Sequence, residues 1–62
     1  MNCGEIRKAI LSIKKPFCQQ DLFNKLKGVN RDAILNSLDY LYDHRLVDYK
    51  QVNGRWAYVI TP

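Results

Sequence analysis

Apolar residues recur at helical spacing over the first two thirds of the chain. In the first segment, residues 2–13, one apolar stripe has charged side chains beside it, and this pattern predicts a helix. The stripe consists of Ile6, Ile10 and Ile13. Asn2 is a good N-cap, and Glu5 follows three residues later, as in a capping box. Pro16 cannot continue a helix and pushes Lys15 toward extended backbone, so we expect the helix to end before it.

A second, shorter helix is predicted for residues 19–27, because apolar residues again fall on one face. That face consists of Leu22, Phe23 and Leu26. Phe17 and Cys18 form a short extended link in front of it, too brief to hold a sheet alone. Cys18 stands where Ser or Thr would normally cap the helix, so this cap is expected to be weak. Gly28 follows the last apolar residue and can take the left-handed conformation that ends a helix.

The third helix is predicted from Arg31 to about His44, with Asn30 as its N-cap. Its apolar stripe, which we expect in the core, consists of Ile34, Leu38 and Leu41. The opposite stripe is polar and acidic, and it consists of Asp32, Asn36, Asp39 and Asp43. A helix, a three-residue turn and a second helix make the helix-turn-helix pattern.

The last segment changes to a period of two residues, which predicts two strands. Between the two runs stands Asn53-Gly54, a strong hairpin signal, because both central residues of a type I′ turn need a positive φ. A two-residue loop pairs Val52 with Arg55. The same register pairs Gln51 with Trp56, Tyr49 with Tyr58 and Val47 with Ile60. The aromatic side chains then share one face, and we expect them to pack in the core under the hairpin.

The composition fits a single small domain spanning residues 1–62. Hydrophobic residues make up 47% of the chain and charged residues 26%, a globular balance rather than one typical of disorder. Ten Lys and Arg against six Asp and Glu give a net charge of +4, which permits a polyanionic partner without requiring one. No apolar run approaches the roughly 20 residues of a membrane span, and no leader-peptide pattern opens the chain. We therefore expect a cytoplasmic protein with no membrane partner.

The residue types needed for catalysis are sparse. A phosphate-binding loop is excluded, because the glycines stand alone at Gly4, Gly28 and Gly54. Cys3, Cys18 and His44 lack the paired spacing of a zinc site, and His44 is interpreted as a surface residue at a helix end. We therefore predict that the chain is not an enzyme and that it holds no cofactor, metal or small-molecule ligand.

Three helices followed by a two-stranded hairpin, with a short extended piece between the first two helices, is the order of the winged helix-turn-helix superfamily, an α+β fold. Residues 17–22 resemble the entry into its second helix, and residues 29–34, with Leu38 and Leu41, resemble its turn and recognition helix. Leu46-Val47 is similar to the start of its wing, and residues 58–61 resemble the returning strand. The length is similar to that of short fimbrial-operon regulators and of small bacterial, phage or plasmid regulators.

This resemblance implies a transcriptional regulator that binds double-stranded DNA, with its third helix in the major groove and its wing on the backbone or an adjacent groove. Arg pairs with guanine and Asn with adenine, and Asp accepts from cytosine, so the start of that helix can read base edges. Basic side chains elsewhere would contact phosphates. The DNA-binding candidates are Asn30, Arg31, Asp32 and Asn36 at the third helix, Lys14, Lys15, Lys25 and Lys27 around the second, and Lys50 and Arg55 on the hairpin.

Two features depart from the superfamily pattern. Its members usually carry Gly at the position of Arg45, so the third helix is expected to end without an easy left-handed residue. Asp39 and Asp43 occupy a face where DNA-binding members typically offer Arg, Ser, Thr or Gln, and they would face phosphates unfavourably.

The alternative hypothesis is a protein-interaction module with the same fold and little DNA affinity, such as a phage or accessory protein that binds host machinery, because fold alone does not determine function. The acidic stripe favours this alternative, as do Leu11, Leu35 and Tyr42, which lie away from the apolar stripes. Leu11 and Leu35 could equally support a homodimer, as a regulator of a two-fold symmetric site requires.

Overall fold

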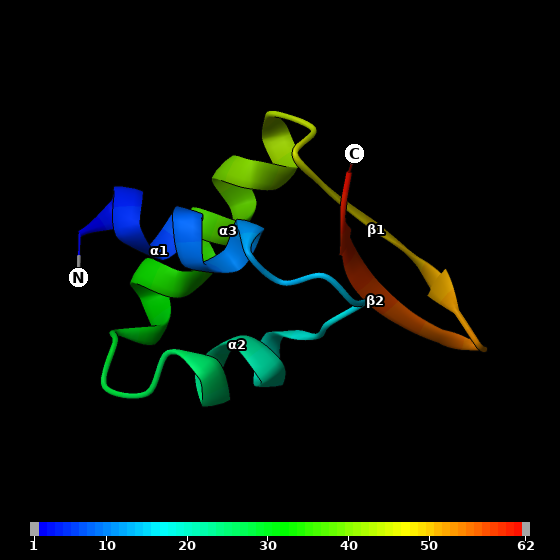
Figure 1. The fold of residues 1–62 in the computed structure, drawn as a ribbon, viewed down its shortest axis with the longest axis horizontal. Helices are drawn as coiled ribbons and strands as arrows, with labels where there is room; N and C mark the ends of the chain where they lie inside the picture. The colour runs from blue at the N-terminus through cyan, green and yellow to red at the C-terminus, as the bar shows by residue number, and fades with distance from the viewer. Residues whose placement is uncertain (1, 62) are drawn as a thin grey trace.

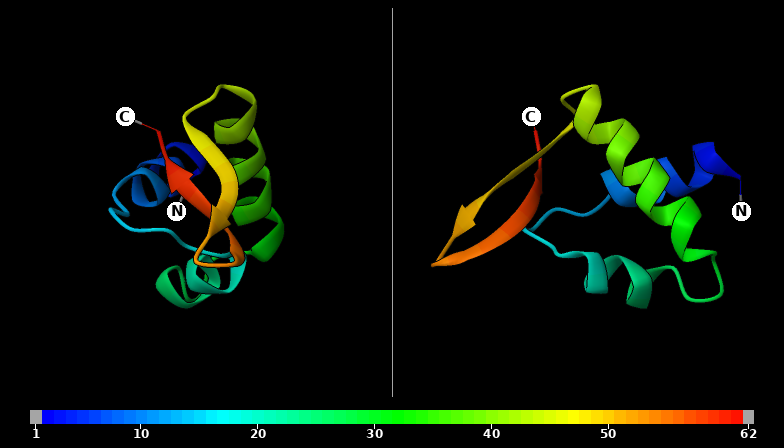
Figure 2. Two further views of the ribbon diagram at one scale, coloured as in Figure 1. Left: turned by 90° about the vertical axis from the view of Figure 1, so that its right-hand side faces the viewer. Right: turned by 180° about the vertical axis from the view of Figure 1, so that it is seen from behind.

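Three helices precede a two-stranded antiparallel hairpin, which confirms the predicted α+β order of elements. The structure is a computed structural model and describes residues 2–61. The elements are α1 (Cys3–Leu11), α2 (Gln19–Lys25), α3 (Arg31–Asp43), β1 (Val47–Val52) and β2 (Arg55–Ile60). The helices pack together at one end of the molecule, and the hairpin projects from them at the other (Figure 1 and Figure 2).

Polar side chains cap the N-terminus of each helix. The Asn2 Oδ1 atom accepts from the Glu5 N–H at 2.9 Å, which confirms the predicted cap of α1. The Asn30 Oδ1 atom accepts from the backbone N–H groups two and three residues later, at 2.8 and 3.3 Å, and so caps α3. At α2 the Cys18 N–H donates to the Asp21 carboxylate at 3.0 Å. A carboxylate three residues into the helix thus compensates for the missing Ser or Thr.

Each helix is shorter than its apolar pattern predicts. α1 ends at residue 11 rather than 13, α2 at residue 25 rather than 27, and α3 at residue 43 rather than 44. Leu26 leaves helical geometry with φ −110° and ψ 52°, so the turn between α2 and α3 spans residues 26–30. Gly28 takes a left-handed φ of +84°, as predicted.

Arg45 ends α3 in the left-handed region even though it is not glycine. Its φ is 60°, and the Thr61 hydroxyl donates to its carbonyl oxygen at 2.8 Å. The Thr61 N–H donates to the Leu46 carbonyl at 3.1 Å. The segment after β2 therefore holds the turn that leads from α3 into β1.

The hairpin has the predicted register. Val52 pairs with Arg55, and the pairing continues to Val47 opposite Ile60. Asn53 and Gly54 have φ values of 52° and 81°, as a type I′ turn requires. The extended link also joins this sheet through a single antiparallel bridge. In that bridge the Phe17 N–H donates to the Tyr58 carbonyl at 2.9 Å, and the Tyr58 N–H donates to the Phe17 carbonyl at 2.7 Å.

The hydrophobic core lies between the three helices and the base of the hairpin. It contains the predicted apolar stripe of α3 and contributions from every helix, from the link and from β1. Its buried members are Ile6, Ile10, Phe17, Leu22, Leu26, Ile34, Leu38, Leu41 and Val47. Tyr58 and Ile60 pack against this cluster from β2 and are partly buried.

The aromatic face of the hairpin is only partly in the core, which corrects the sequence prediction. Tyr58 reaches the core cluster, but Tyr49 is 43% exposed and Trp56 is 59% exposed. The hairpin extends past the helices, so its base packs against them and the half near its turn does not (Figure 2). Alternation along a strand indicates which side chains share a face, and the reach of the neighbouring helices decides how much of that face is covered.

Candidate functional site

The start of α3 presents the side chains that were predicted to read bases. Arg31, Asp32 and Asn36 are all exposed. The Arg31 guanidinium lies over the Phe23 ring, 4.7 Å from its centroid, so this side chain is held against α2 by a cation–π contact. The Asn30 side-chain oxygen is already used to cap α3. Asn30 therefore serves the helix itself, whereas Arg31 and Asn36 are open to a ligand.

Three of the five predicted phosphate-binding lysines line one hollow on the α1 and α2 side. We call it the lysine groove; its lining residues are Ser12, Ile13, Lys14, Lys15, Phe17, Asp21 and Lys25. The pKa of the Asp21 carboxyl lies below its ordinary value, first because the Cys18 N–H donates to it, with a smaller contribution from the Lys15 ammonium. The lysine groove therefore includes an ionised carboxylate among its three ammonium groups.

The two basic residues of the hairpin lie on its outer face. Lys50 pairs with Ala57, and Arg55 pairs with Val52, so their side chains leave the sheet on the side opposite Tyr49. Both are exposed. The hairpin thus has an aromatic face, which lines the hollows beside α2 and α3, and an opposite face on which Asp48 accompanies Lys50 and Arg55.

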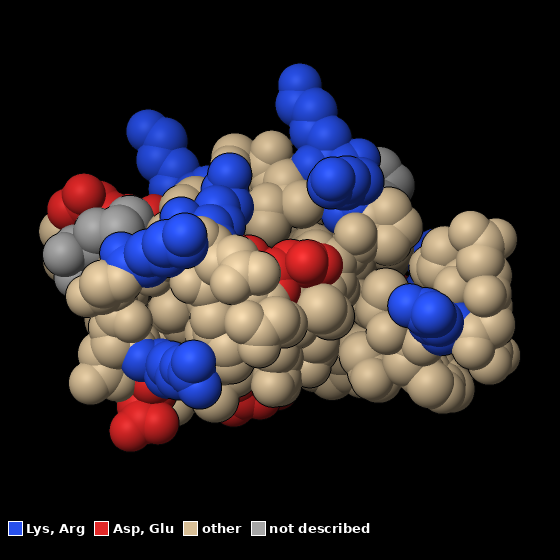
Figure 3. Space-filling view, turned by 90° about the horizontal axis from the view of Figure 1, so that it is seen from below, with Lys and Arg blue, Asp and Glu red and all other residues tan. Residues whose placement is uncertain are grey.

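The ten DNA-binding candidates form separate groups rather than one patch. All ten are exposed. The groups are the lysine groove, the α2–α3 turn with the start of α3, and the outer face of the hairpin. Figure 3 shows Lys and Arg gathered over the helical end and a separate basic group on the projecting hairpin, with uncharged and acidic surface between them.

The outer face of α3 is acidic and exposed along its length, as predicted. Asp32, Asn36, Asp39 and Asp43 all face solvent. Leu35 is half-buried beside this stripe, and Tyr42 is 49% exposed. An apolar edge therefore runs next to the acidic stripe, on the side where α3 faces the hairpin.

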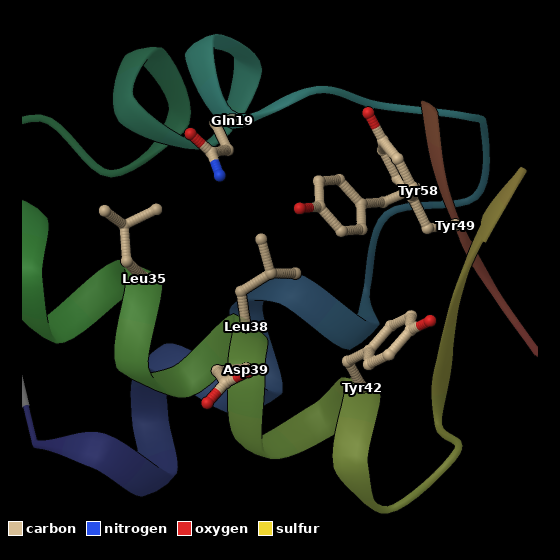
Figure 4. Close-up of a pocket in the computed structure, with 7 residues that line it drawn as sticks. All are labelled: Gln19, Leu35, Leu38, Asp39, Tyr42, Tyr49 and Tyr58. Atoms are coloured by element: carbon tan, nitrogen blue, oxygen red, sulfur yellow. The ribbon is translucent and has the colours of Figure 1, made fainter. Parts of the chain in front are cut away.

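A second hollow, which the sequence analysis missed, lies between α3 and the hairpin. We call it the α3–hairpin groove; it measures about 300 Å³ and is lined by Gln19, Leu35, Leu38, Asp39, Tyr42, Tyr49 and Tyr58. Figure 4 shows these side chains arranged around it from α2, α3 and both strands. An adjoining hollow shares three of these residues and extends to Phe23 and Trp56. The signal in the sequence was the number of aromatic residues in the hairpin, which exceeds what its short base can bury.

Among residues 2–61, no group of three His, Cys, Asp or Glu side chains is placed to hold a metal ion. Cys3 and Cys18 are free and exposed. His44 stacks on Tyr40 with ring centroids 4.0 Å apart, and its Nδ1 atom lies 2.9 Å from the Tyr40 carbonyl oxygen. This places His44 at the end of α3, as predicted.

Comparisons with known proteins identified no relative of this chain. No family model, curated protein or solved structure matches the chain. In residues 2–61, no helix is long and apolar enough to cross a membrane.

Proposed function

We propose that this chain is a winged helix-turn-helix protein that binds double-stranded DNA with the first turns of α3. The observation that carries the proposal is the exposed start of α3, where Arg31 and Asn36 are both open to solvent. Arg and Asn are the side chains that read guanine and adenine in the major groove. The hairpin follows α3 in the chain, as a wing would, and its Lys50 and Arg55 side chains are available for phosphates.

The acidic residues toward the end of α3 repel DNA phosphates only weakly in this mode of binding, because they lie far from the start of the helix. Asp39 and Asp43 follow Arg31 by eight and twelve residues, which at 1.5 Å per residue is about 12 and 18 Å along the helix axis. The screening length at physiological salt is about 8 Å, so phosphates near Arg31 feel little repulsion from either carboxylate. Asp32 lies at the contact end itself, and there it would accept a hydrogen bond from cytosine.

The basic residues away from α3 supply attraction without sequence preference. Lys27 precedes α3 in the turn and is exposed, so it would contact a phosphate next to the bases that Arg31 reads. The lysine groove lies on the α1 and α2 side and would act on the DNA at longer range. Each phosphate neutralised by a lysine releases counterions and makes the affinity depend more steeply on salt.

A selection experiment tests the proposal. Duplexes with a randomised centre are selected on the protein, and the affinity of the enriched sequence is measured by fluorescence anisotropy. Arg31→Ala should weaken binding by about 1–3 kcal/mol and relax the preference at one base pair. Lys8→Ala is the matched control, because Lys8 is an exposed cation on α1 outside the proposed interface. Equal losses for the two variants, or no enriched sequence, would contradict α3 as the reading element.

A second candidate function is a protein-interaction module with little DNA affinity. The specific observation in its favour is the exposed aromatic surface beside the acidic stripe of α3, in the α3–hairpin groove. Exposed apolar surface with polar residues at its rim is typical of an interaction site. The same anisotropy measurement separates the two functions, since the second predicts negligible binding to any duplex at physiological salt.

A further inference from the structure

We infer that the α3–hairpin groove is the docking site for a basic amphipathic segment of a partner protein. One apolar side chain of the segment enters the groove, and a Lys or Arg beside it pairs with Asp39. This inference rests on the second candidate function, protein interaction, and specifies the chemistry of the partner. It does not depend on DNA binding.

The walls of the groove are suited to an apolar anchor. Leu35 and Leu38 form its floor on α3, and tyrosines from α3 and both strands surround it (Figure 4). A volume of about 300 Å³ is at the small end of known ligand pockets and accommodates one large side chain rather than an extended ligand.

The hairpin wall of the groove is ordered before any partner binds. Tyr49 packs against Tyr58 with ring centroids 4.6 Å apart and against Trp56 at 5.3 Å. Aromatic side chains have few rotatable bonds, and these are already held by one another, so binding costs little side-chain entropy. Trp56 extends the same wall into the adjoining hollow and is 59% exposed. Trp and Tyr are the residues most enriched at binding hot spots.

The charge of the groove selects a basic partner. Among the residues that line it, Asp39 is the charged one, and Asp43 lies one turn further along the same exposed stripe. The chain as a whole carries +4, but no Lys or Arg is among the residues that line this groove, and Arg45 lines a separate hollow together with Asp43. The local charge at the α3–hairpin groove is thus opposite in sign to that of the whole chain, which favours a cationic segment and disfavours nucleic acid or an acidic peptide.

A second copy of this chain fits the groove poorly. A two-fold symmetric contact centred on this groove would bring the Asp39 carboxylates of both copies close together, and no Lys or Arg lines the groove to separate them. A contact from the lysine groove of one copy to the α3–hairpin groove of the next would be head-to-tail, and such contacts close into rings only at particular rotations. Charge disfavours the symmetric contact and the need for closure disfavours the head-to-tail contact, so a different protein is the occupant that we infer.

Peptide display tests the inference. Random linear peptides are selected on the immobilised protein, and the best are synthesised and titrated by anisotropy and by NMR of the labelled protein. We expect the selected peptides to carry Lys or Arg beside an aromatic or leucine residue and to shift the signals of Leu35, Tyr42 and Tyr49. Asp39→Lys and Tyr42→Ala should each weaken binding about tenfold or more, as expected for hot-spot contacts. Glu5→Lys, a charge reversal at an exposed acidic residue of α1 outside the groove, should change the peptide affinity less than about twofold.

Other results would overturn the inference in distinguishable ways. This docking site would be refuted by peptides that bind Asp39→Lys and wild type with equal affinity, or that shift the NMR signals of the lysine groove instead. A protein-interaction function would still be supported. A display that enriches no peptide would refute both. Groove signals that shift with protein concentration alone would identify a second copy as the occupant and refute a foreign partner.

Discussion

The indole of Trp56 stacks on the phenol ring of Tyr49, with ring centroids 5.3 Å apart and 20° between the ring planes. Both rings nevertheless remain exposed to solvent, at 59% and 43%. A stacked aromatic pair contributes about 0.5–1.5 kcal/mol beyond its buried area, whereas truncating a buried aromatic costs about 3–5 kcal/mol. The outer half of the hairpin is therefore held by cross-strand stacking rather than by the core.

Truncation of this indole should have a small effect on stability. We expect Trp56→Ala to lower the free energy of unfolding by about 1 kcal/mol, because stacking is lost but no core cavity forms. Leu41→Ala is the core control: Leu41 is 1% exposed, and its truncation should cost about 2–5 kcal/mol. Urea denaturation followed by circular dichroism measures both changes. A loss at Trp56 as large as that at Leu41 would contradict the exposed position of the indole.

The position of Trp56 illustrates what local patterns predict in this molecule. The Asn53-Gly54 pair and the alternation around it correctly predicted the strand register, and helical periodicity correctly predicted Ile34, Leu38 and Leu41 in the core. Those features depend on neighbours a few residues apart. Coverage of the hairpin depends on how far the helices reach along it, which is a tertiary property, so the same alternation wrongly predicted a buried Trp56.

For the candidate sites, too, the sequence predicts features that depend on neighbouring residues and misses features that depend on tertiary packing. Helical periodicity correctly predicted that Arg31 and Asn36 face solvent. It could not predict that Lys25 joins Lys14 and Lys15 in one groove, because their meeting depends on how the link after α1 folds back toward α2. The α3–hairpin groove was missed for a related reason: its walls come from three elements, and no single segment of the sequence displays it.

The left-handed turn after α3 offers a route to a more stable protein. Arg45 has a φ of 60°, a conformation that costs a residue with a Cβ roughly 1 kcal/mol or more and costs glycine little. We expect Arg45→Gly to raise the free energy of unfolding by about 1 kcal/mol. Arg45→Ala removes the same side chain but keeps the strained Cβ, so it should bring no such gain. Equal stability of the Gly and Ala variants would show that backbone strain at this position is negligible.

The type I′ turn of the hairpin should not tolerate a β-branched residue. Gly54 has a φ of +81° and open space around its Cα, so the obstacle to a side chain is conformational rather than steric crowding by neighbours. We expect Gly54→Val to cost about 2 kcal/mol or more in thermal and urea melts. Gly4 provides the contrast, because it lies in α1, where a Cβ would meet the Asn2 oxygen at an ordinary 3.4 Å. Gly4→Ala should therefore leave stability unchanged or raise it by up to about 1 kcal/mol.

The Asp21 carboxylate should make the start of α2 sensitive to acid. Its pKa is lowered in the folded protein, first by the hydrogen bond from the Cys18 N–H and further by the nearby Lys15 ammonium. A lowered folded-state pKa means that the stabilisation is present above the ordinary value of 3.8 and is lost as the pH falls through the folded value. We expect Asp21→Asn to be less stable than wild type at pH 7, with the difference shrinking in melts below pH 4. If the stability difference between Asp21→Asn and wild type persists unchanged in acid, it arises from side-chain geometry rather than from charge.

The hairpin lysine should act on DNA through phosphates alone. Lys50 lies on the outer face of the hairpin, away from the bases that the start of α3 would read. We expect Lys50→Ala to weaken binding to all duplexes alike and to reduce the slope of log affinity against log salt concentration by about one unit. Anisotropy titrations of a selected and an unrelated duplex at several salt concentrations measure this. A loss confined to the selected duplex would place Lys50 at a base edge instead.

The aspartates of α3 separate the two candidate functions most directly. If DNA lies at the start of α3, a phosphate beside Arg31 is about 12 Å from Asp39 along the helix axis, where repulsion in water is about 0.3 kcal/mol before screening. Asp39→Asn should therefore tighten non-specific binding slightly at about 10 mM salt, and Asp43→Asn less; both gains should vanish at about 150 mM, where the screening length is near 8 Å. If instead the α3–hairpin groove holds a basic segment, Asp39→Asn should weaken that complex and leave DNA binding negligible at both salt concentrations. An Asp39→Asn protein whose affinities for duplex at about 10 mM salt and for selected peptides both match wild type would contradict the two assignments together.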